Sequence, residues 1–256
     1  MELNDYRNFF FDLDRTLWDW DSTLIGAEDL VYTLNDTGRN VYFHTDNTLL
    51  SRKAYAEKLT SMGIPAEESQ VLTSGFVAAE ILAKTNTQEV YAVGEQGLVE
   101  EIGLKDIQIS EEASKAVVGF DRNFNYDKLS RLKEIVEEDG KIYTCSTEKV
   151  FKRRADSRPH QGAFNSAIKH FGDVGNVGKP SQAFRDVFDD YFDYFPGKSL
   201  FIGDRFADIE IGNELGMDTA AVLSGQITEE KLKKAEDEQV PDYVLTGLHK
   251  LRRRII

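Results

Sequence analysis

The most informative stretch of the sequence is Phe9-Phe10-Phe11-Asp12-Leu13-Asp14-Arg15-Thr16-Leu17. Its three consecutive aromatic residues are typical of a strand that is buried on both faces. Asp12 and Asp14 follow at the end of that strand, where the chain turns and both carboxylates can approach one place. Two anions held so close together need a cation beside them, and Mg²⁺ prefers oxygen ligands of this kind. The alternative is a pair of solvated carboxylates in a turn.

Strand-like and helix-like patterns alternate around this stretch and again late in the chain. The predicted strands are 8–13, 40–45, 199–203 and 219–223. The predicted helices are 27–37, 51–62, 181–194, 207–215 and 229–236. Alternation of this kind indicates a parallel sheet that helices cover on both faces. The sequence therefore predicts an α/β fold with a doubly wound parallel sheet.

The middle of the chain repeats this pattern on a smaller scale. The expected elements there are strands at 89–93, 115–119 and 141–145 and a helix at 126–138. We interpret residues 74–172 as an inserted, smaller α/β cap domain. Residues 1–73 and 173–256 then form the core domain.

The composition excludes several classes of protein. The 256 residues include 31 Lys and Arg against 45 Asp and Glu, which gives a formal net charge of −14. This charge argues against broad electrostatic binding to nucleic acid or to an anionic membrane. A single cysteine, Cys145, excludes an internal disulfide and a zinc site built from several thiolates. The N-terminal residues lack a signal-peptide pattern and no apolar run is long enough to span a membrane, so a cytoplasmic location is expected.

Polar residues also stand where the other predicted strands end, which is where parallel sheets bind ligands. Thr45-Asp46-Asn47 closes one strand, and Asp204 follows another. Asp208 comes four positions after Asp204, so both carboxylates can face one direction where a helix begins. Lys179 lies in a turn between Gly178 and Pro180, a frame suited to aiming an ammonium group at a phosphate.

Together these four segments, in this order, resemble the haloacid dehalogenase (HAD) superfamily along essentially the whole chain. The sequence is most similar to subfamily IIA, which includes the nucleotide monophosphatase NagD, the 4-nitrophenylphosphatases and the phosphoglycolate phosphatases. The flanking stretches that match this subgroup are 17–18, 51–59, 118–121 and 178–181. The separation between Thr45 and Lys179 is far longer than one crossover needs. It therefore places the inserted domain between the second and third motifs, as in this subgroup.

The resemblance implies Mg²⁺-dependent hydrolysis of a small phosphomonoester through an aspartyl-phosphate intermediate. Asp12 would be the nucleophile, because a carboxylate is ionised at neutral pH and forms a labile mixed anhydride. Asp14 would be the general acid and base, protonating the leaving alkoxide and then activating water. Asp12, Asp14, Asp204 and Asp208 would hold the Mg²⁺, Asp14 through its backbone carbonyl.

By the same resemblance, the phosphoryl oxygens would be bound by Thr45, Asp46, Asn47 and Lys179. One lysine and one metal ion would balance the phosphate charge in a strongly acidic protein. His44, directly before Thr45, is expected to be a structural residue, with a role in the site as the alternative.

Three residues depart from the family pattern. Arg15 stands where the family usually has glycine, and its side chain either points to solvent, which we favour, or helps to hold phosphate. Asp46 replaces an asparagine and adds a negative charge near the phosphate, unless it faces away or joins the metal network. Asp208 follows Asp204 by four positions, where this subgroup usually has five.

In the cap, the resemblance matches the substrate-specificity loop to residues 145–148, with Ser146 where the subgroup usually has asparagine and Glu148 where it usually has aspartate. The basic residues that follow are Arg153, Arg154, Arg158 and His160. They form either a solvated loop or a site for an anionic substrate tail, such as a carboxylate or a second phosphate. The expected partners are a small phosphorylated metabolite and a second copy of the chain, bound through the cap as a homodimer.

Two other functions stay open. A weakly active or inactive relative would bind phosphorylated ligands, and Arg15 and Asp46 are the residues that favour it. A phosphotransferase would pass the phosphoryl group to an alcohol instead of water. The substrate also stays open among glycolate, glycerol, sugar and nucleotide phosphates.

Overall fold

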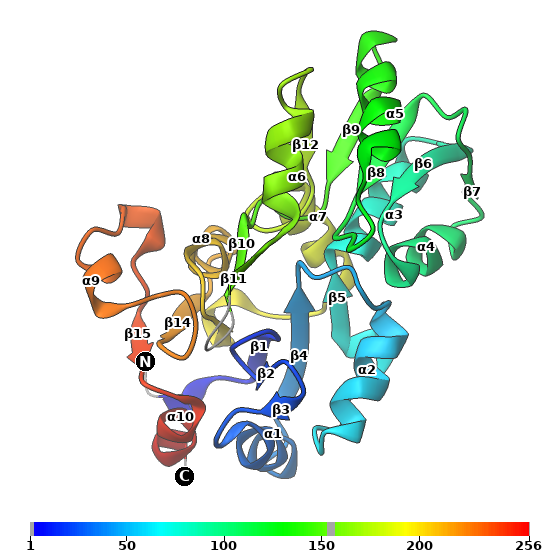
Figure 1. The fold of residues 1–256 in the computed structure, drawn as a ribbon. Coiled ribbons are helices and arrows are strands. Elements are labelled where there is room, and N and C mark those ends of the chain that lie inside the picture. Colours follow the sequence, from blue (N-terminus) through cyan, green and yellow to red (C-terminus); the bar gives the residue numbers. More distant parts are fainter. Residues whose placement is uncertain (1–2, 153–156, 256) are drawn as a thin grey trace. The chain divides into compact units, whose positions relative to one another are not determined.

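The computed structural model describes residues 3–152 and 157–255, which divide into two units (Figure 1). The first unit contains Met1–Thr45, Tyr55–Val71 and Phe188–Ile256, and the second contains Asp46–Ala54 and Leu72–Val187. The predicted domain boundaries at 74 and 172 stay a prediction.

The first unit is built on a six-stranded sheet with the order β15-β14-β13-β1-β4-β5. Its strands are β1 (Asn8–Asp12), β4 (Asn40–Thr45), β5 (Val71–Thr73), β13 (Ser199–Gly203), β14 (Asp218–Val222) and β15 (Tyr243–Leu245). β1 pairs in parallel with both β13 and β4, and β14 pairs in parallel with β13 and β15. Every residue of β1 and β13 is buried, as expected for central strands that are covered on both faces.

The chain reverses its direction of winding at β1. β4 and β5 lie on one side of this strand, whereas β13, β14 and β15 lie on the other. Doubly wound sheets bind ligands at the carboxyl ends of their strands beside such a reversal. Asp12, the last residue of β1, stands at that position.

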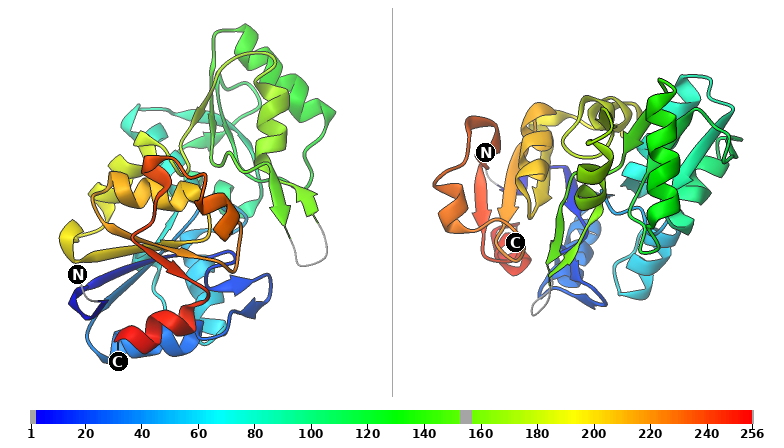
Figure 2. Two further views of the ribbon diagram at one scale, coloured as in Figure 1. Left: turned by 90° about the vertical axis from the view of Figure 1, so that its left-hand side faces the viewer. Right: turned by 45° about the horizontal axis from the view of Figure 1, so that its top comes forward.

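Helices cover both faces of this sheet. Helices α1 (Ala27–Asp36) and α10 (Leu248–Ile255) lie on one face and α8 (Phe206–Glu214) lies on the other (Figure 2). Two further helices, α2 (Arg52–Ser61) and α7 (Gln182–Tyr191), belong partly to this unit, and α9 (Glu229–Leu232) belongs wholly to it. The short elements are the hairpin of β2 (Trp18–Asp19) with β3 (Ser22–Thr23) and 3₁₀ turns at Leu3–Asp5, Glu68–Gln70, Pro196–Lys198 and Asp237–Gln239.

One predicted helix is shorter than expected. The pattern predicted a helix over 229–236, but α9 ends at Leu232. None of its residues is buried. A helix without a packed face gains little stability, which explains its length.

The second unit is built on a five-stranded sheet with the order β12-β9-β8-β6-β7. Its strands are β6 (Glu89–Val93), β7 (Gln108–Ile109), β8 (Lys115–Val118), β9 (Lys141–Thr144) and β12 (Val174–Asn176), all paired in parallel. Its helices are α3 (Ser74–Lys84), α4 (Gln96–Gly103), α5 (Tyr126–Glu137) and α6 (Gln161–Ile168). An antiparallel hairpin of β10 (Val150–Lys152) and β11 (Ser157–Pro159) precedes α6. Parallel sheets with covering helices confirm the predicted α/β fold class.

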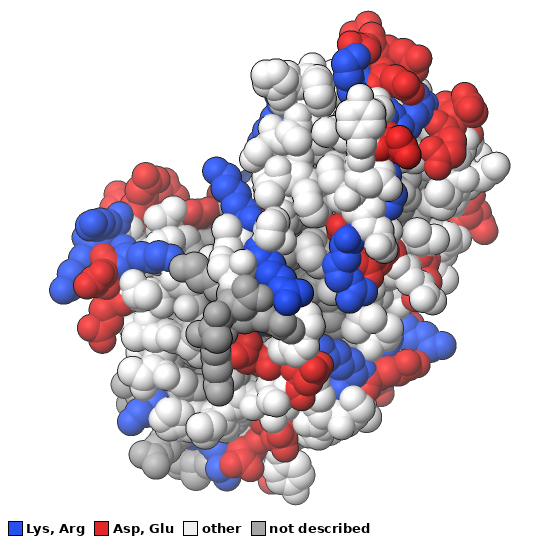
Figure 3. All heavy atoms as spheres, in the orientation of Figure 1, with Lys and Arg blue, Asp and Glu red and all other residues white. Residues whose placement is uncertain are grey.

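Two surface properties bear on function. No helix within the described ranges 3–152 and 157–255 is both long and apolar enough to cross a membrane. On the face drawn in Figure 3, basic side chains lie in small separate groups with acidic side chains between them.

Candidate active site

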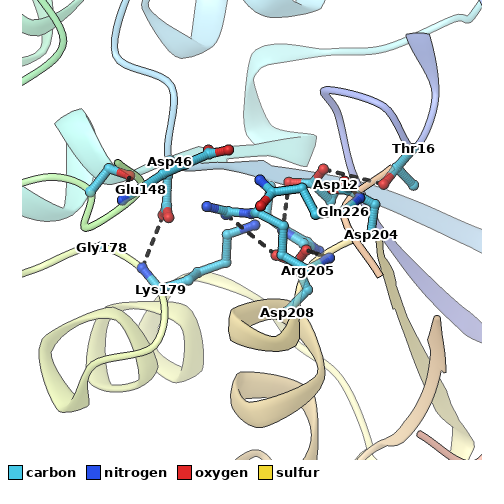
Figure 4. Close-up of polar contacts among 12 residues, drawn as sticks. Asp12, Thr16, Asp46, Glu148, Gly178, Lys179, Asp204, Arg205, Asp208 and Gln226 are labelled. Atoms are coloured by element: carbon cyan, nitrogen blue, oxygen red, sulfur yellow. Dashed lines mark hydrogen bonds and ion pairs between the residues drawn. The ribbon is translucent and has the colours of Figure 1, made fainter. Parts of the chain in front are cut away.

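Asp12 lies at the carboxyl end of β1 with only 3% of its surface exposed. Thr16 Oγ1 donates a hydrogen bond to Asp12 Oδ2 at 3.2 Å (Figure 4). His44 lies opposite Asp12 in the parallel register of β1 and β4, and its Nδ1 is 4.0 Å from Asp12 Oδ1. His44 is itself fully buried, with its ring stacked on Phe201 at 4.1 Å between centroids. A hydroxyl therefore holds this carboxylate by a hydrogen bond, and a buried imidazole lies beside it.

Asp208 joins Asp12 and His44 in a close group of potential metal ligands. One ligand atom from each of the three lies within 4.8 Å of the others, and all three side chains are buried. Asp208 belongs to the first turn of α8, where its Oδ2 accepts a hydrogen bond from the Arg205 N–H at 3.0 Å. Gly203 permits this approach, because a Cβ at that position would lie 2.3 Å from the Cβ of Asp208.

Asp204 follows β13 and is fully buried. Its Oδ2 accepts a hydrogen bond from the Gln226 N–H at 2.9 Å, as drawn in Figure 4. Within the described residues its Oδ1 has no hydrogen-bond partner. Gly225 leaves space for this carboxylate, because a Cβ there would lie 1.7 Å from Asp204 Oδ2.

Burial, with a smaller contribution from the nearby Asp208, raises the pKa of Asp204 to about 7, although Arg15, Arg205 and the Gln226 N–H each lower it. A buried carboxylate that is costly to ionise and has an unpartnered oxygen suits a bound cation. Asp12 and Asp208 lie close enough together to share a hard divalent cation, and the unpartnered oxygen of Asp204 makes that carboxylate a candidate ligand as well.

The structure groups the predicted ligands differently from the sequence. Asp12 and Asp208 lie together, but the third member of their group is His44, whereas Asp204 contacts Gln226 and Arg15. The signal for His44 was its place directly before Thr45, at the end of a strand. Recognising it requires the register between β4 and β1, which the sequence of either strand alone does not contain.

Asp14 is held by a tryptophan that sequence reasoning did not assign to the site. Trp18 Nε1 donates a hydrogen bond to Asp14 Oδ1 at 2.9 Å. Trp18 is fully buried, with its ring nearly parallel to that of Tyr55 and the Lys58 ammonium 4.4 Å from its centroid. A packed indole fixes the carboxylate that is predicted to transfer protons.

The expectation that Arg15 points to solvent is wrong. Its side chain is buried, and its Nε lies 3.6 Å from Asp204 Oδ2. Arg15 has a φ of 65°, in the left-handed region that favours glycine. This backbone conformation explains the glycine that the family usually has here.

In the second unit, the side chain of Asp46 is hydrogen-bonded to the backbone of Lys179. The Lys179 N–H donates to Asp46 Oδ1 at 2.9 Å, and Lys179 is fully buried (Figure 4). Asn176 braces the same turn, because its side chain donates to the Gly178 carbonyl at 3.0 Å and accepts from the Gly178 N–H at 3.1 Å. One Asp46 oxygen is thus bound to the lysine turn, so the residue that replaces the family asparagine has a structural partner.

The other predicted phosphate ligands lie at or just after the end of β4. Thr45 is buried as the last residue of that strand. Asn47 Oδ1 accepts a hydrogen bond from the Leu49 N–H at 3.1 Å, and the Asp46 carbonyl accepts one from Ser74 Oγ at 2.9 Å. Side-chain hydrogen bonds therefore order the turn that follows Thr45.

The predicted specificity residues have different environments. Glu148 is half-buried, and its carbonyl accepts a hydrogen bond from the Gly162 N–H at 2.7 Å. Arg158 is exposed on β11. His160 is buried, with its ring stacked on Phe120 at 4.6 Å between centroids. Arg153 and Arg154 lie outside the described residues.

Comparison with known proteins gives consistent matches. Residues 9–108 match the family described as haloacid dehalogenase-like hydrolase, and residues 176–251 match the HAD-hydrolase-like family. The 5′-nucleotidase YutF of Bacillus subtilis is 28% identical, over 96% of this chain and 97% of its own length. The chloroplastic phosphoglycolate phosphatase 1A of Arabidopsis thaliana is 27% identical, over 94% of this chain and 75% of its own length.

Among solved structures, the 4-nitrophenylphosphatase of Thermotoga maritima superimposes with a TM-score of 0.89 at 26% identity, over 99% of both chains. The motif order, the parallel sheet with acids at its strand ends and these matches agree. The chain therefore belongs to the haloacid dehalogenase-like hydrolases, as an HAD-type phosphatase of the branch that includes NagD and the 4-nitrophenylphosphatases.

Proposed function

We propose that this protein hydrolyses small phosphomonoesters in a Mg²⁺-dependent reaction through an aspartyl-phosphate on Asp12. The observation that carries the proposal is the buried Asp12 carboxylate, held by Thr16 and grouped with Asp208 and His44. The names of the relatives support the substrate class, because a 5′-nucleotidase, a phosphoglycolate phosphatase and a 4-nitrophenylphosphatase are each named for a phosphomonoester.

Asp12, Asp204, Asp208 and the backbone carbonyl of Asp14 would hold the Mg²⁺. When bound, the cation would offset the charge of the phosphate and of the clustered carboxylates. Mg²⁺ prefers oxygen donors, so we assign His44 to orienting Asp12 rather than to the cation.

Two carboxylates would divide the chemistry. A carboxylate oxygen of Asp12 forms a bond to phosphorus while the ester bond from phosphorus to the alcohol oxygen breaks. Asp14 gives its proton to the departing oxygen, then removes a proton from the water that attacks the aspartyl-phosphate. That attack releases inorganic phosphate and restores Asp12, and the Trp18 N–H keeps Asp14 in place throughout.

Thr45, Asn47 and Lys179 are the proposed donors to the phosphoryl oxygens, since hydroxyl, amide and ammonium groups stabilise developing negative charge. We assign Asp46 to holding the Lys179 turn rather than to the phosphate, on the basis of its hydrogen bond to the Lys179 N–H. The proposed ligand is a small phosphorylated metabolite. Sedimentation analysis would test the further proposal of a homodimer formed through the second unit.

A phosphate-release screen tests the proposal. The panel contains 4-nitrophenyl phosphate, phosphoglycolate, glycerol phosphate, sugar phosphates and nucleoside monophosphates, each with and without Mg²⁺. We expect release that requires Mg²⁺, and a loss of at least about 10³-fold for Asp12→Asn. Asp36→Asn, at an exposed position on α1, is the matched control and should keep its rate. Radiolabelled phosphate should be recovered on acid-quenched wild-type protein and not on Asp12→Asn.

The outcomes separate the alternatives. Binding of phosphoesters without release from any of them would favour a phospho-ligand binding protein. Release that requires an added alcohol acceptor would favour a phosphotransferase. Full activity of Asp12→Asn would contradict the mechanism.

A further inference from the structure

Two arginines lie beside carboxylates of the proposed cation site. Arg15 Nε is 3.6 Å from Asp204 Oδ2, and Arg205 Nη2 is 3.6 Å from Asp208 Oδ1. Arg205 precedes α8, so its pairing with Asp208 stays within one helical turn. Arg15 instead comes from the turn after β1 and reaches an acid that follows a different strand. The pairing of Arg15 with Asp204 is therefore a tertiary contact.

The backbone around Arg15 is held in an unfavourable conformation. Its φ of 65° is disfavoured for a residue with a Cβ. The Arg15 N–H donates to the Trp18 carbonyl at 2.5 Å, and Ser224 Oγ donates to the Arg15 carbonyl at 2.7 Å. Hydrogen bonds from two parts of the chain thus keep the backbone where the guanidinium faces inward.

Asp204 is enclosed, so the partners it can use are few. One of its oxygens is bound to the Gln226 N–H, and the other has no hydrogen-bond partner among the described residues. A fully buried anion of this kind is unstable unless a positive charge lies near it. The Arg15 guanidinium, itself 7% exposed, supplies a positive charge from inside the protein.

We infer that Arg15 is an internal counter-ion of Asp204 and thereby tunes the affinity of the site for its divalent cation. With no cation bound, the guanidinium favours the charged form of Asp204 and holds its carboxylate in position. When a cation binds, the two positive charges share Asp204 and repel each other, so Arg15 weakens cation binding. The inference makes Arg15 a positioning residue, and it rests on the proposed function only in that the site takes a divalent cation.

Calorimetric titration of metal-free protein with MgCl₂ and MnCl₂, without substrate, tests this inference. Arg15→Met removes the charge and keeps most of the side-chain length, whereas Arg15→Lys keeps the charge. We expect Arg15→Met to bind both cations about tenfold more tightly or better, and Arg15→Lys to stay within about threefold of wild type. Asp139→Gly relieves a comparable left-handed residue, with φ of 58°, on the exposed surface, and should not change the affinity.

Thermal unfolding of the metal-free protein is the second measurement. Arg15→Met should lower Tm by about 3–6 °C, because it leaves the buried Asp204 without its counter-ion. The same substitution should have little effect in an Asp204→Asn background, where no buried charge needs a partner. Should Arg15→Met fail to fold, Arg15→Gly removes the charge and the backbone strain together, and its cation affinity carries the test.

Unchanged or weaker cation binding by Arg15→Met would overturn the inference, as would an equal loss of Tm in the Asp204→Asn background. Unchanged cation affinity with weaker binding of inorganic phosphate would assign the guanidinium to phosphate instead. Failure of the wild type to bind any divalent cation would contradict the proposed function, and the thermal cycle would then decide the Arg15–Asp204 pairing alone. Tight cation binding without phosphate release would contradict the proposed function while leaving this inference intact.

Discussion

The two parallel sheets share an architecture and differ at the carboxyl ends of their strands. In the first unit, β1 ends in the buried Asp12 and β13 is followed by the buried Asp204, which has an unpartnered oxygen among the described residues. In the second unit, Asp121 occupies a similar place after β8, but it accepts hydrogen bonds from Lys128 Nζ and, at 2.7 Å, from the Asn123 N–H. An acid at a strand end thus becomes a candidate for chemistry when the protein leaves part of its bonding capacity unused.

The end of β9 in the second unit shows the same contrast. Thr144 Oγ1 donates to Asn165 Oδ1 at 2.9 Å and accepts from Gln161 Nε2 at 2.6 Å. Asn165 Nδ2 donates to the Ser146 carbonyl at 2.7 Å. These buried groups bind one another and fix the loop that begins at Ser146. Their role is to shape that loop, which the family resemblance connects with substrate choice.

Among substitutions of the acids at the strand ends of the two units, the largest expected effect is on cation binding. Asp204→Asn should weaken Mg²⁺ binding by at least about 100-fold, because it removes a charged oxygen donor from the site. Asp121→Asn, the corresponding change in the second unit, should leave the Mg²⁺ affinity unchanged and lower the free energy of unfolding. Calorimetry and urea unfolding measure both quantities. Equal cation affinities for the two variants would remove the distinction between the strand ends.

The pH dependence of stability sharpens the same comparison. The pKa of Asp204 rises from 3.8 to about 7 on folding, so the folded state holds the proton more tightly than the unfolded state. The stability that this group contributes is complete below about pH 4 and is lost as the pH rises through 7. With a chelator present, Asp204→Asn should therefore gain stability relative to wild type between pH 5 and pH 8.

The upper limit of that gain is on the order of 4 kcal/mol, since one pKa unit corresponds to about 1.36 kcal/mol. Urea unfolding at several pH values measures it, and added Mg²⁺ should reverse the loss in the wild type. A difference between the two proteins that does not vary with pH would contradict the assignment of the raised pKa to Asp204.

A smaller effect is expected from the polar network of the second unit. Asn165→Ala should lower the free energy of unfolding by about 1–3 kcal/mol, because it leaves buried partners of Asn165 without hydrogen bonds. It should also change KM between substrates while leaving the Mg²⁺ affinity constant. Ser166→Ala, on the exposed side of the same helix, should stay within about 0.5 kcal/mol of wild type. A changed Mg²⁺ affinity for Asn165→Ala would show that the network does more than shape its loop.

The smallest effect is expected at Arg158, which is exposed on β11. Arg158→Ala should raise KM by about two- to fivefold for substrates with a second anionic group, since an exposed ion pair contributes at most about 1 kcal/mol. KM for 4-nitrophenyl phosphate and Tm should stay unchanged. Equal changes in KM for both kinds of substrate would remove the proposed recognition of an anionic tail.

Much of the core could be read from the sequence because its patterns are local. The aromatic run at 9–11 gave the buried β1, and the apolar run before Asp204 gave β13, each within one residue of its bounds. Alternation of such strands with helices gave the fold class. The hairpin β10–β11 was not predicted, because each strand has only three residues and β11 is exposed along its whole length.

The site was harder to predict, because its geometry depends on contacts between distant segments. The place of His44 beside Asp12 follows from strand register, and the burial of Arg15 accompanies its contacts with the distant residues Asp204 and Ser224. Neither the position of His44 nor the burial of Arg15 can be predicted from composition or from the spacing of residues. The hydrogen bond from the Lys179 N–H to Asp46 likewise joins residues that are far apart in the sequence.

The hydrogen bond between Trp18 and Asp14 makes the fluorescence of Trp18 a natural probe of the site. The chain has two tryptophans: Trp18 is fully buried against Asp14, whereas Trp20 is 44% exposed. Iodide can quench the emission of Trp20 and leave that of Trp18 visible. Because the Trp18 indole donates its N–H to the Asp14 carboxylate, we expect a change at that carboxylate to alter the emission of Trp18. A stopped-flow instrument can therefore follow the proposed acid–base step without any label.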